Sequence, residues 1–305
     1  YAQNVVLVKL FGHRGYSSIY PENTIRAFNG ACKNGFDGLE IDIWESYNGD
    51  LMIFHDRNTK RLCGKSEAIW KISTENRDQY LVKQNGMKEL IPTFPEVLEL
   101  VRKTKMPLLL HVKAAPGYQL SNEGVNRIIS LIKQYEVTDQ VYVFANNEKV
   151  IQPFCNKGVR IGRVTVSSDK NEVRSLVDWL AENNGELLII NRVRDIKMMD
   201  PGFVEYCHTK NVKVGSYFTE TLEEFEYMIS IKADFAMADS NLLSLYQDKY
   251  IRYRDSGSSS TYNYATIVSM KNRTGLKCTV EVKTDKVRKY YIYKQTGQPE
   301  DSKFL

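Results

Sequence analysis

The sequence predicts an α/β protein that folds as a (β/α)8 barrel, a TIM barrel, with a short β-rich appendage at its C-terminal end. Three observations lead to this prediction. Between residues 7 and 239, runs of strand-forming residues alternate about eight times with amphipathic helical patterns. The 305 residues leave room for one barrel of about 250 residues and a small addition. After residue 250 the helical patterns stop and Thr-, Val- and Tyr-rich runs replace them.

Each expected element has its own local signal, because apolar residues repeat every two positions or run continuously in strands and every three to four positions in helices. The expected strands lie at residues 7–11, 39–44, 51–54, 108–112, 140–145, 159–165, 187–193, 212–218 and 233–239. The expected helices lie at residues 23–35, 94–104, 124–135, 171–183, 201–211 and 222–231. We expect Asn23 to cap the first helix and Gly35 to end it.

The chain divides into a barrel over residues 1–250, a linker over 251–260 and a small β-rich basic appendage over 261–305. The linker prediction depends on the run DSGSSS, whose composition is typical of flexible segments. Within the barrel, residues 57–91 are the longest connection and form an insertion. It is expected to be either a lid over the barrel mouth or a plain solvated insertion.

Composition excludes several classes of protein. An apolar fraction of 42% and a charged fraction of 26%, without a long apolar run, do not fit a membrane-spanning chain. The five cysteines form no CxxC pair, which argues against a structural zinc or redox site. The net charge of +5 is concentrated in residues 251–305, which hold 11 Lys or Arg against 5 Asp or Glu. This tail could attract an anionic surface, and no nucleic acid partner is expected.

Five side chains point to a catalytic pocket. His13, His55 and His111 lie at or near the ends of expected strands, and imidazole transfers protons near neutral pH. Glu40 and Asp42 are two residues apart in an apolar strand, so both face the same side. Two buried like charges require a neutralising cation. Since strand ends converge at one rim of a barrel, the sequence predicts a metal site beside histidines in one pocket.

Three segments carry a family resemblance. HRGYSSIYPENTIRAF, GFDGLEIDIW and LMIFHD, within residues 13–56, resemble the glycerophosphodiester phosphodiesterases, whose signature runs HRG, PENT, an E-x-D strand and a following HD. The resemblance continues more loosely to about Tyr246 and excludes the tail. It implies a TIM barrel that hydrolyses glycerophosphodiesters to glycerol 3-phosphate and an alcohol, usually with a divalent cation.

The resemblance also implies roles for individual residues. His13 and His55 match the catalytic acid/base pair, in which one histidine deprotonates the nucleophile and the other protonates the leaving group. The resemblance also implies that a hydroxyl of the substrate's own glycerol can act as the nucleophile, which gives a cyclic phosphate intermediate. Arg14 and Lys113 match the two cationic contacts of the phosphate.

One divalent metal ion is the expected cofactor. Glu40 and Asp42 match two of the family's metal ligands, but the third, the Glu of an E-x-K strand, is replaced by His111. The resemblance implies Ca or Mg, whereas an imidazole ligand suits Mn or Zn better. The alternatives are that His111 only fills space or supports the ligands, and that Glu40 and Asp42 pair with Arg14 and Lys113 without a metal.

The later strands depart from the family pattern. Where relatives carry Trp-Thr-Val-Asn, this chain has Gly215-Ser216-Tyr217-Phe218, and the T-D pair near the last strand keeps only Asp239. Tyr217 and Phe218 are either a wall for the alcohol part of the substrate or part of the core. The identity of the substrate therefore depends most on these positions.

The leading prediction is metal-dependent hydrolysis of a small-molecule or lipid-derived phosphodiester by two histidines. One alternative is a phospholipase D-like enzyme that acts on lysophospholipids or sphingolipids, for which the basic tail would provide attraction to an anionic surface. A second is a barrel that binds a phosphodiester or polymer without cleaving it. The sequence begins with Tyr1 and not Met, so a removed signal peptide would be invisible in it. The location stays open, with a secreted or cell-envelope location favoured over a cytoplasmic one.

Overall fold

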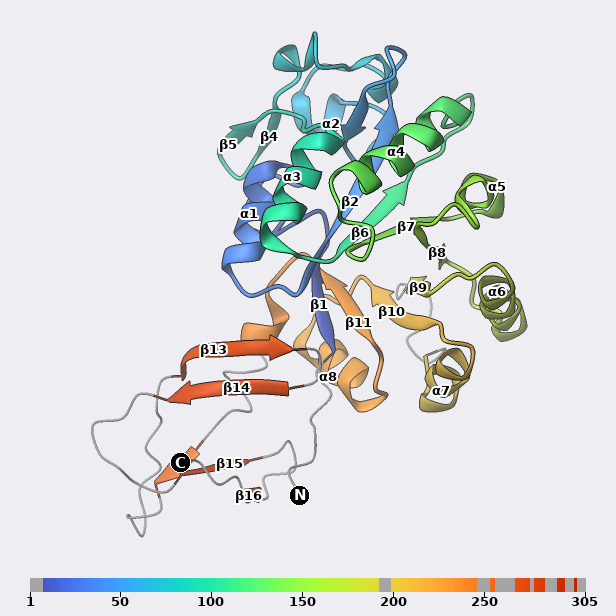
Figure 1. Ribbon diagram of the computed structural model, residues 1–305. Helices are drawn as coiled ribbons and strands as arrows, with labels where there is room; N and C mark the ends of the chain where they lie inside the picture. The colour runs from blue at the N-terminus through green and yellow to red at the C-terminus, as the bar shows by residue number, and fades with distance from the viewer. Residues whose placement is uncertain are drawn as a thin grey trace.

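The computed structural model describes residues 8–191 and 199–245, and the backbone of residues 253–255, 267–274, 277–282, 290–293 and 299–300. Eight parallel strands close into a barrel, since β1 pairs with both β2 and β11 (Figure 1). In order around the barrel they are β1 (Lys9–Gly12), β2 (Gly38–Glu45), β6 (Leu108–Val112), β7 (Val141–Ala145), β8 (Arg160–Thr165), β9 (Leu187–Asn191), β10 (Lys213–Tyr217) and β11 (Phe235–Ala238). The predicted TIM barrel is confirmed.

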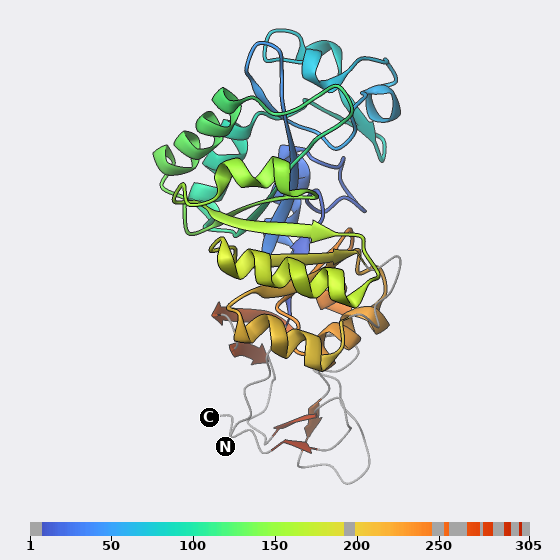
Figure 2. The ribbon, with the colours of Figure 1, turned by 90° about the vertical axis from the view of Figure 1, so that its right-hand side faces the viewer.

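Helices cover the outside of this barrel (Figures 1 and 2). They are α1 (Ile25–Lys33), α3 (Phe94–Thr104), α4 (Asn122–Gln134), α5 (Glu148–Ile151), α6 (Lys170–Glu182), α7 (Pro201–Thr209) and α8 (Leu222–Ser230). Helices α3 and α8 each begin with a capping box, from Thr93 and Thr221 respectively. The short α5 follows β7, where the sequence predicted no helix.

The prediction that Asn23 caps the first helix is wrong. The cap of α1 is Thr24, whose hydroxyl accepts a hydrogen bond from the Ala27 N–H. The Asn23 amide instead donates to the buried Asp42 carboxylate at 2.8 Å. A residue that looked like a local helix signal is therefore part of the pocket.

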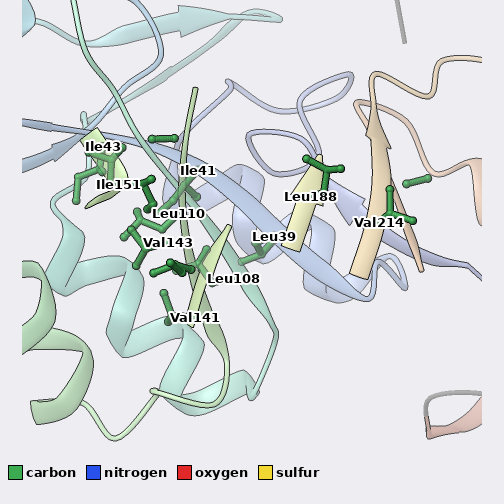
Figure 3. Close-up of a cluster of buried hydrophobic side chains, with 14 of the residues drawn as sticks. Leu39, Ile41, Ile43, Leu108, Leu110, Val141, Val143, Ile151, Leu188 and Val214 are labelled. Carbon is green, nitrogen blue, oxygen red and sulfur yellow. The ribbon is translucent and has the colours of Figure 1, made fainter. Parts of the chain in front are cut away.

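Alternate residues of each strand face two different cores. Outward-facing residues such as Leu39, Ile41 and Leu110 pack beneath the helices (Figure 3). Inward-facing residues such as Leu109 and Phe144 fill the barrel interior. Because side chains alternate along a strand, residues 40 and 42 on β2 and residue 111 on β6 face inward near the strand ends.

The segment after β2 is built outside the ring of eight strands. Strand β3 (Leu51–Ile53) pairs antiparallel with β2. The insertion at residues 57–91 then forms α2 (Lys60–Cys63), η1 (Ile69–Lys71), η2 (Arg77–Gln79), β4 (Val82–Gln84) and β5 (Met87–Glu89). Its residues Leu62, Ile69 and Val82 join Trp44 and Phe54 in a separate buried cluster. The insertion is therefore packed against β2 and the chain that follows β3.

Short antiparallel strands follow the barrel. Strand β13 (Ile267–Thr274) pairs with β14 (Lys277–Val282), and β15 (Tyr290–Tyr293) pairs with β12 (Tyr253–Asp255) and β16 (Pro299–Glu300). Apart from β12, the predicted linker at 251–260 lies outside the described residues. The domain boundaries and the role of the basic tail therefore stay predictions. Among the described residues, no helix combines the length and apolarity needed to cross a bilayer.

Candidate active site

One pocket of about 350 Å³ at the carboxyl ends of the barrel strands brings the predicted site residues together. They are His13, Arg14, Glu40, Asp42, His55, His111, Lys113, Tyr217 and Phe218. They come from β2, β6 and β10 and from the chain directly after β1, β3, β6 and β10, so the convergence of strand ends places them. The fourth histidine, His208, lies elsewhere and bonds to Asp234 at 2.8 Å.

The HRG turn after β1 positions Arg14. Gly15 has a φ of +84°, and a Cβ atom there would lie 2.7 Å from the backbone carbon of Ala27, so the turn requires glycine. The Arg14 backbone N–H donates to the Glu40 carboxylate at 3.1 Å. Its guanidinium donates to the Glu22 carboxylate at 2.8 Å. The turn thus holds a cation and a backbone donor against the pocket.

The two carboxylates of β2 that line the pocket, Glu40 and Asp42, have unequal surroundings. Both are buried, Glu40 being 2% exposed and Asp42 1% exposed. Burial works to raise the pKa of Asp42, but Lys113 at 3.2 Å and further partners hold it well below its usual value. Burial and repulsion from Asp42 raise the pKa of Glu40. Among residues 8–191 and 199–245, no lysine or arginine side-chain nitrogen lies within 4.0 Å of Glu40. Of the two pocket carboxylates, Glu40 is therefore the one without a lysine or arginine nitrogen at ion-pair distance.

His111 lies with Glu40 and Asp42 in a group of side chains that could hold a cation. Single ligand atoms of Glu40, Asp42 and His111 lie within 4.8 Å of one another. Nε2 of His111 is 2.6 Å from the Asn146 side-chain oxygen, and the ring stacks on Phe144 with centroids 4.6 Å apart. Burial lowers the pKa of His111, which favours a neutral ring with one N–H.

In the tautomer that carries the proton of this neutral ring on Nε2, the Asn146 oxygen accepts it. The lone pair of Nδ1 then faces the Asp42 carboxylate at 3.2 Å, so two hydrogen-bond acceptors lie opposite each other with no proton between them. A cation between them would satisfy both, and a ligand histidine held by a hydrogen bond on its other nitrogen is the usual arrangement at metal sites. The residues present therefore fit a divalent cation.

His13 and His55 share one geometry. Nδ1 of His13 is 2.8 Å from the Asp239 carboxylate, and Nδ1 of His55 is 2.7 Å from the Asp56 carboxylate. Each carboxylate favours the tautomer with its proton on Nδ1, which leaves Nε2 able to accept a proton. Burial lowers the pKa of His13 although Asp239 opposes the shift. The rings of Phe218 and His13 pack edge to face, with their centroids 4.5 Å apart.

Arg61 in the insertion was not predicted as a site residue. Its guanidinium donates to the Glu22 carboxylate at 2.6 and 2.9 Å and to the Asp56 carboxylate at 2.6 and 3.2 Å. Because Glu22 also binds Arg14, these contacts connect Arg14 to His55 through three ionised side chains. The nearest signal in the sequence was the placement of Arg61 five residues after the HD pair.

The aromatic pair at the carboxyl end of strand β10 lines the pocket. The Tyr217 hydroxyl accepts a hydrogen bond from the Asn191 amide at 3.3 Å, and the Phe218 ring contacts His13 as described above. Both side chains therefore lie at the wall of the pocket. Contact with substrate stays a prediction.

Comparisons with known proteins agree with this geometry. The profile of the "Glycerophosphoryl diester phosphodiesterase family" matches residues 13–243. A glycerophosphodiester phosphodiesterase of Bacillus altitudinis is 27% identical over 146 residues, which cover 45% of this chain and 57% of the relative. A protein of Mycoplasma genitalium is 48% identical over 130 residues, which cover 41% of this chain and 52% of the relative. The chain thus matches little more than half the length of these curated relatives.

Solved structures share the fold. A phosphodiesterase of Oleispira antarctica, solved in complex with the product sn-glycerol-3-phosphate, superposes with a TM-score of 0.68 at 21% identity. The superposition covers 79% of this chain and 96% of that one. At this level of sequence identity, the similarity shows that the two proteins share the barrel fold and nothing more.

Proposed function

Because the chain belongs to the glycerophosphoryl diester phosphodiesterase family, we propose that it hydrolyses glycerophosphodiesters to glycerol 3-phosphate and an alcohol. The observation that carries the proposal is the pocket itself. Two histidines, each held at Nδ1 by a carboxylate, line the same cavity as Arg14, Lys113 and a buried carboxylate pair. The glycerol 3-phosphate bound to the related Oleispira antarctica phosphodiesterase supports a small phosphodiester as substrate.

The chain's own residues divide the work of the reaction. Arg14 and Lys113 line the pocket as cations and would bind the phosphoryl oxygens, where negative charge accumulates. Of His13 and His55, one accepts the proton of the attacking glycerol hydroxyl and the other donates a proton to the departing alkoxide. Water then opens the cyclic phosphate, with the two histidines in exchanged roles, and gives glycerol 3-phosphate. Asp239 and Asp56 keep each ring in the required tautomer.

Glu40, Asp42 and His111 would hold one divalent cation. When bound, such an ion stabilises negative charge on phosphoryl oxygens. With two carboxylates and one imidazole, this set favours Mn or Zn over Ca, which prefers an all-oxygen shell. The raised pKa of Glu40 and the 3.2 Å approach of His111 Nδ1 to the Asp42 carboxylate support a cation in this place.

Replacing His111 by alanine is expected to weaken Mn²⁺ and Zn²⁺ binding by at least about tenfold, because one of three proposed ligands is lost. Isothermal titration of metal-free protein measures the affinity directly. His208→Ala removes an imidazole bound to Asp234 outside the pocket and should leave the affinity unchanged. Equal Mn²⁺ affinity in wild type and His111→Ala would show that His111 is not a ligand.

A substrate panel tests the proposed function. The wild-type protein is incubated with glycerophosphocholine, lysophosphatidylcholine and a glycerol phosphate polymer, each with Ca, Mg, Mn and Zn. Release of glycerol 3-phosphate from glycerophosphocholine is the expected result. Cleavage of the lysolipid alone would favour a phospholipase D-like enzyme. Binding without cleavage of any substrate would favour the non-catalytic barrel and contradict the proposal.

A further inference from the structure

Arg163 on β8 is a buried cation that the proposed reaction does not use. Arg163 is 7% exposed, and its guanidinium carbon lies 5.3 Å from the centre of the Trp179 ring on α6. Nη2 donates to the backbone oxygen of Asn146 at 3.2 Å. Nε is buried and has no hydrogen-bond partner among the described residues.

This arrangement leaves the cation poorly compensated. Within residues 8–191 and 199–245, no carboxylate oxygen lies within 4.0 Å of the Arg163 guanidinium, whereas Arg160 on the same strand binds Glu186 at 2.5 Å. Burial lowers the pKa of Arg163, the direction expected for a charge removed from water, although attraction to the exposed Glu148 carboxylate opposes the shift. A guanidinium has five N–H donors and stays charged, so a buried one with spare donors is suited to an anion.

Arg163 lines a groove of about 710 Å³ outside the barrel. The groove is lined by residues at the end of β8, on α5 and on α6, and these two helices lie on the side of the barrel that faces the viewer in Figure 2. Trp179 and the hydroxyl-bearing Ser167, Ser168 and Ser175 form its walls. A stacking ring, hydroxyls and a cation are the groups that bind a polyol carrying negative charge.

The groove adjoins the candidate active site. Asn146 lines both cavities: its side chain bonds to His111 in the active-site pocket, and its backbone oxygen accepts from Arg163 in the groove. Val164 also lines both. A substrate whose phosphodiester lies beside His111 could therefore extend its alcohol part toward Arg163.

We propose that this groove is a subsite for an anionic group on the alcohol half of the phosphodiester substrate, with Arg163 as its charged contact. The inference rests on the proposed function and adds the substrate class, an alcohol that carries a second negative charge. Glu148 and Glu172 also line the groove, but both are exposed, and the Glu172 carboxylate accepts a hydrogen bond from Ser167 at 2.6 Å. Solvent screens these rim charges, whereas the buried Arg163 charge is screened much less.

A matched pair of substrates tests the subsite. One is glycerophosphoglycerol, and the other is the same diester with a phosphate on the far hydroxyl of its leaving glycerol. Arg163→Gln is expected to raise KM for the phosphorylated diester about tenfold, the usual size of a lost charge-assisted hydrogen bond. KM for glycerophosphoglycerol and kcat for both substrates should stay within about twofold, since Arg163 lies outside the catalytic pocket.

Two further variants keep the test decisive. Arg160→Gln removes an equivalent charge from the other end of β8 and should change neither KM. Ser168→Glu adds a negative charge at an exposed groove position without touching buried Arg163. It should raise KM for the phosphorylated diester alone, even if Arg163→Gln fails to fold.

The outcomes separate the two proposals. If wild-type protein cleaves neither diester, the proposed function fails. If it cleaves both but Arg163→Gln and Ser168→Glu change the two KM values equally or not at all, the subsite alone is refuted. A third outcome is that inorganic phosphate alters cleavage of glycerophosphoglycerol by wild type but not by Arg163→Gln, and that the two diesters have equal KM values. The groove would then bind a free anion, and the inference would also be overturned.

Discussion

Replacing His13 or His55 by alanine is expected to lower kcat for glycerophosphocholine cleavage by about 10²- to 10⁴-fold, the range that a positioned acid or base contributes. Each histidine has an ionised partner at Nδ1 and lines the pocket, so each is held ready for proton transfer. The two losses of kcat should be similar. Without one histidine, deprotonation of the nucleophile limits the rate, and without the other, protonation of the leaving group limits it. Rates are compared at saturating substrate and metal.

The controls for this experiment separate chemistry from folding. His208→Ala removes a histidine outside the pocket and should leave kcat unchanged. Circular dichroism and thermal unfolding should show an intact barrel in all variants. Asp239→Asn, which keeps the size of the side chain, should lower kcat less than His13→Ala does, because Asp239 acts through the ring. More than a tenth of the wild-type kcat in either His→Ala variant would refute the assigned pair.

Asp42→Asn is expected to have two large effects, on metal binding and on folding. It removes a proposed carboxylate ligand, so titration with Mn²⁺ should show an affinity at least about a hundredfold weaker. It also leaves the Lys113 ammonium, 3.2 Å away and largely buried, without its carboxylate partner. Breaking a buried ion pair on one side destabilises proteins by about 3–5 kcal/mol, and urea unfolding of metal-free protein should show a loss of this order.

A surface carboxylate provides the comparison. Glu99 on α3 pairs with Arg102 at 2.9 Å and Lys103 at 3.1 Å on an exposed helix face. Glu99→Gln should change neither the Mn²⁺ affinity nor the urea midpoint measurably, because exposed ion pairs contribute little. Wild-type Mn²⁺ affinity in Asp42→Asn would contradict the proposed ligand set, whatever happens to stability.

The sequence predicts the parts of the site that local patterns encode. Strand periodicity places Glu40 and Asp42 on the inward face of β2, and the structure has them there because side chains alternate along a strand. Convergence of the strand ends then brings His13, His55 and His111 to the same cavity. These inferences need only the period of a strand and the closure of a barrel.

Contacts between distant segments could not be predicted in this way. Asp239 binds His13 across 226 residues, a pairing that exists only because β11 lies beside β1 in the closed barrel. Asn23 has the sequence context of a helix cap, and only the tertiary structure shows its amide on Asp42. In the sequence, Arg163 resembles any arginine on the surface of a strand. Only the structure shows that Trp179 of α6 packs over its guanidinium and that the residue is buried.

The guanidinium of Arg61 has a consequence for protein engineering. It comes from α2, in the part of the chain with the weakest sequence signal, yet it joins Glu22 to Asp56 behind His55. A minimal enzyme made by deleting residues 57–91 would keep the HRG, PENT, E-x-D and HD motifs and lose this tether. Transplanting the signature residues onto another barrel scaffold would therefore also require a guanidinium supplied from outside the eight repeating units.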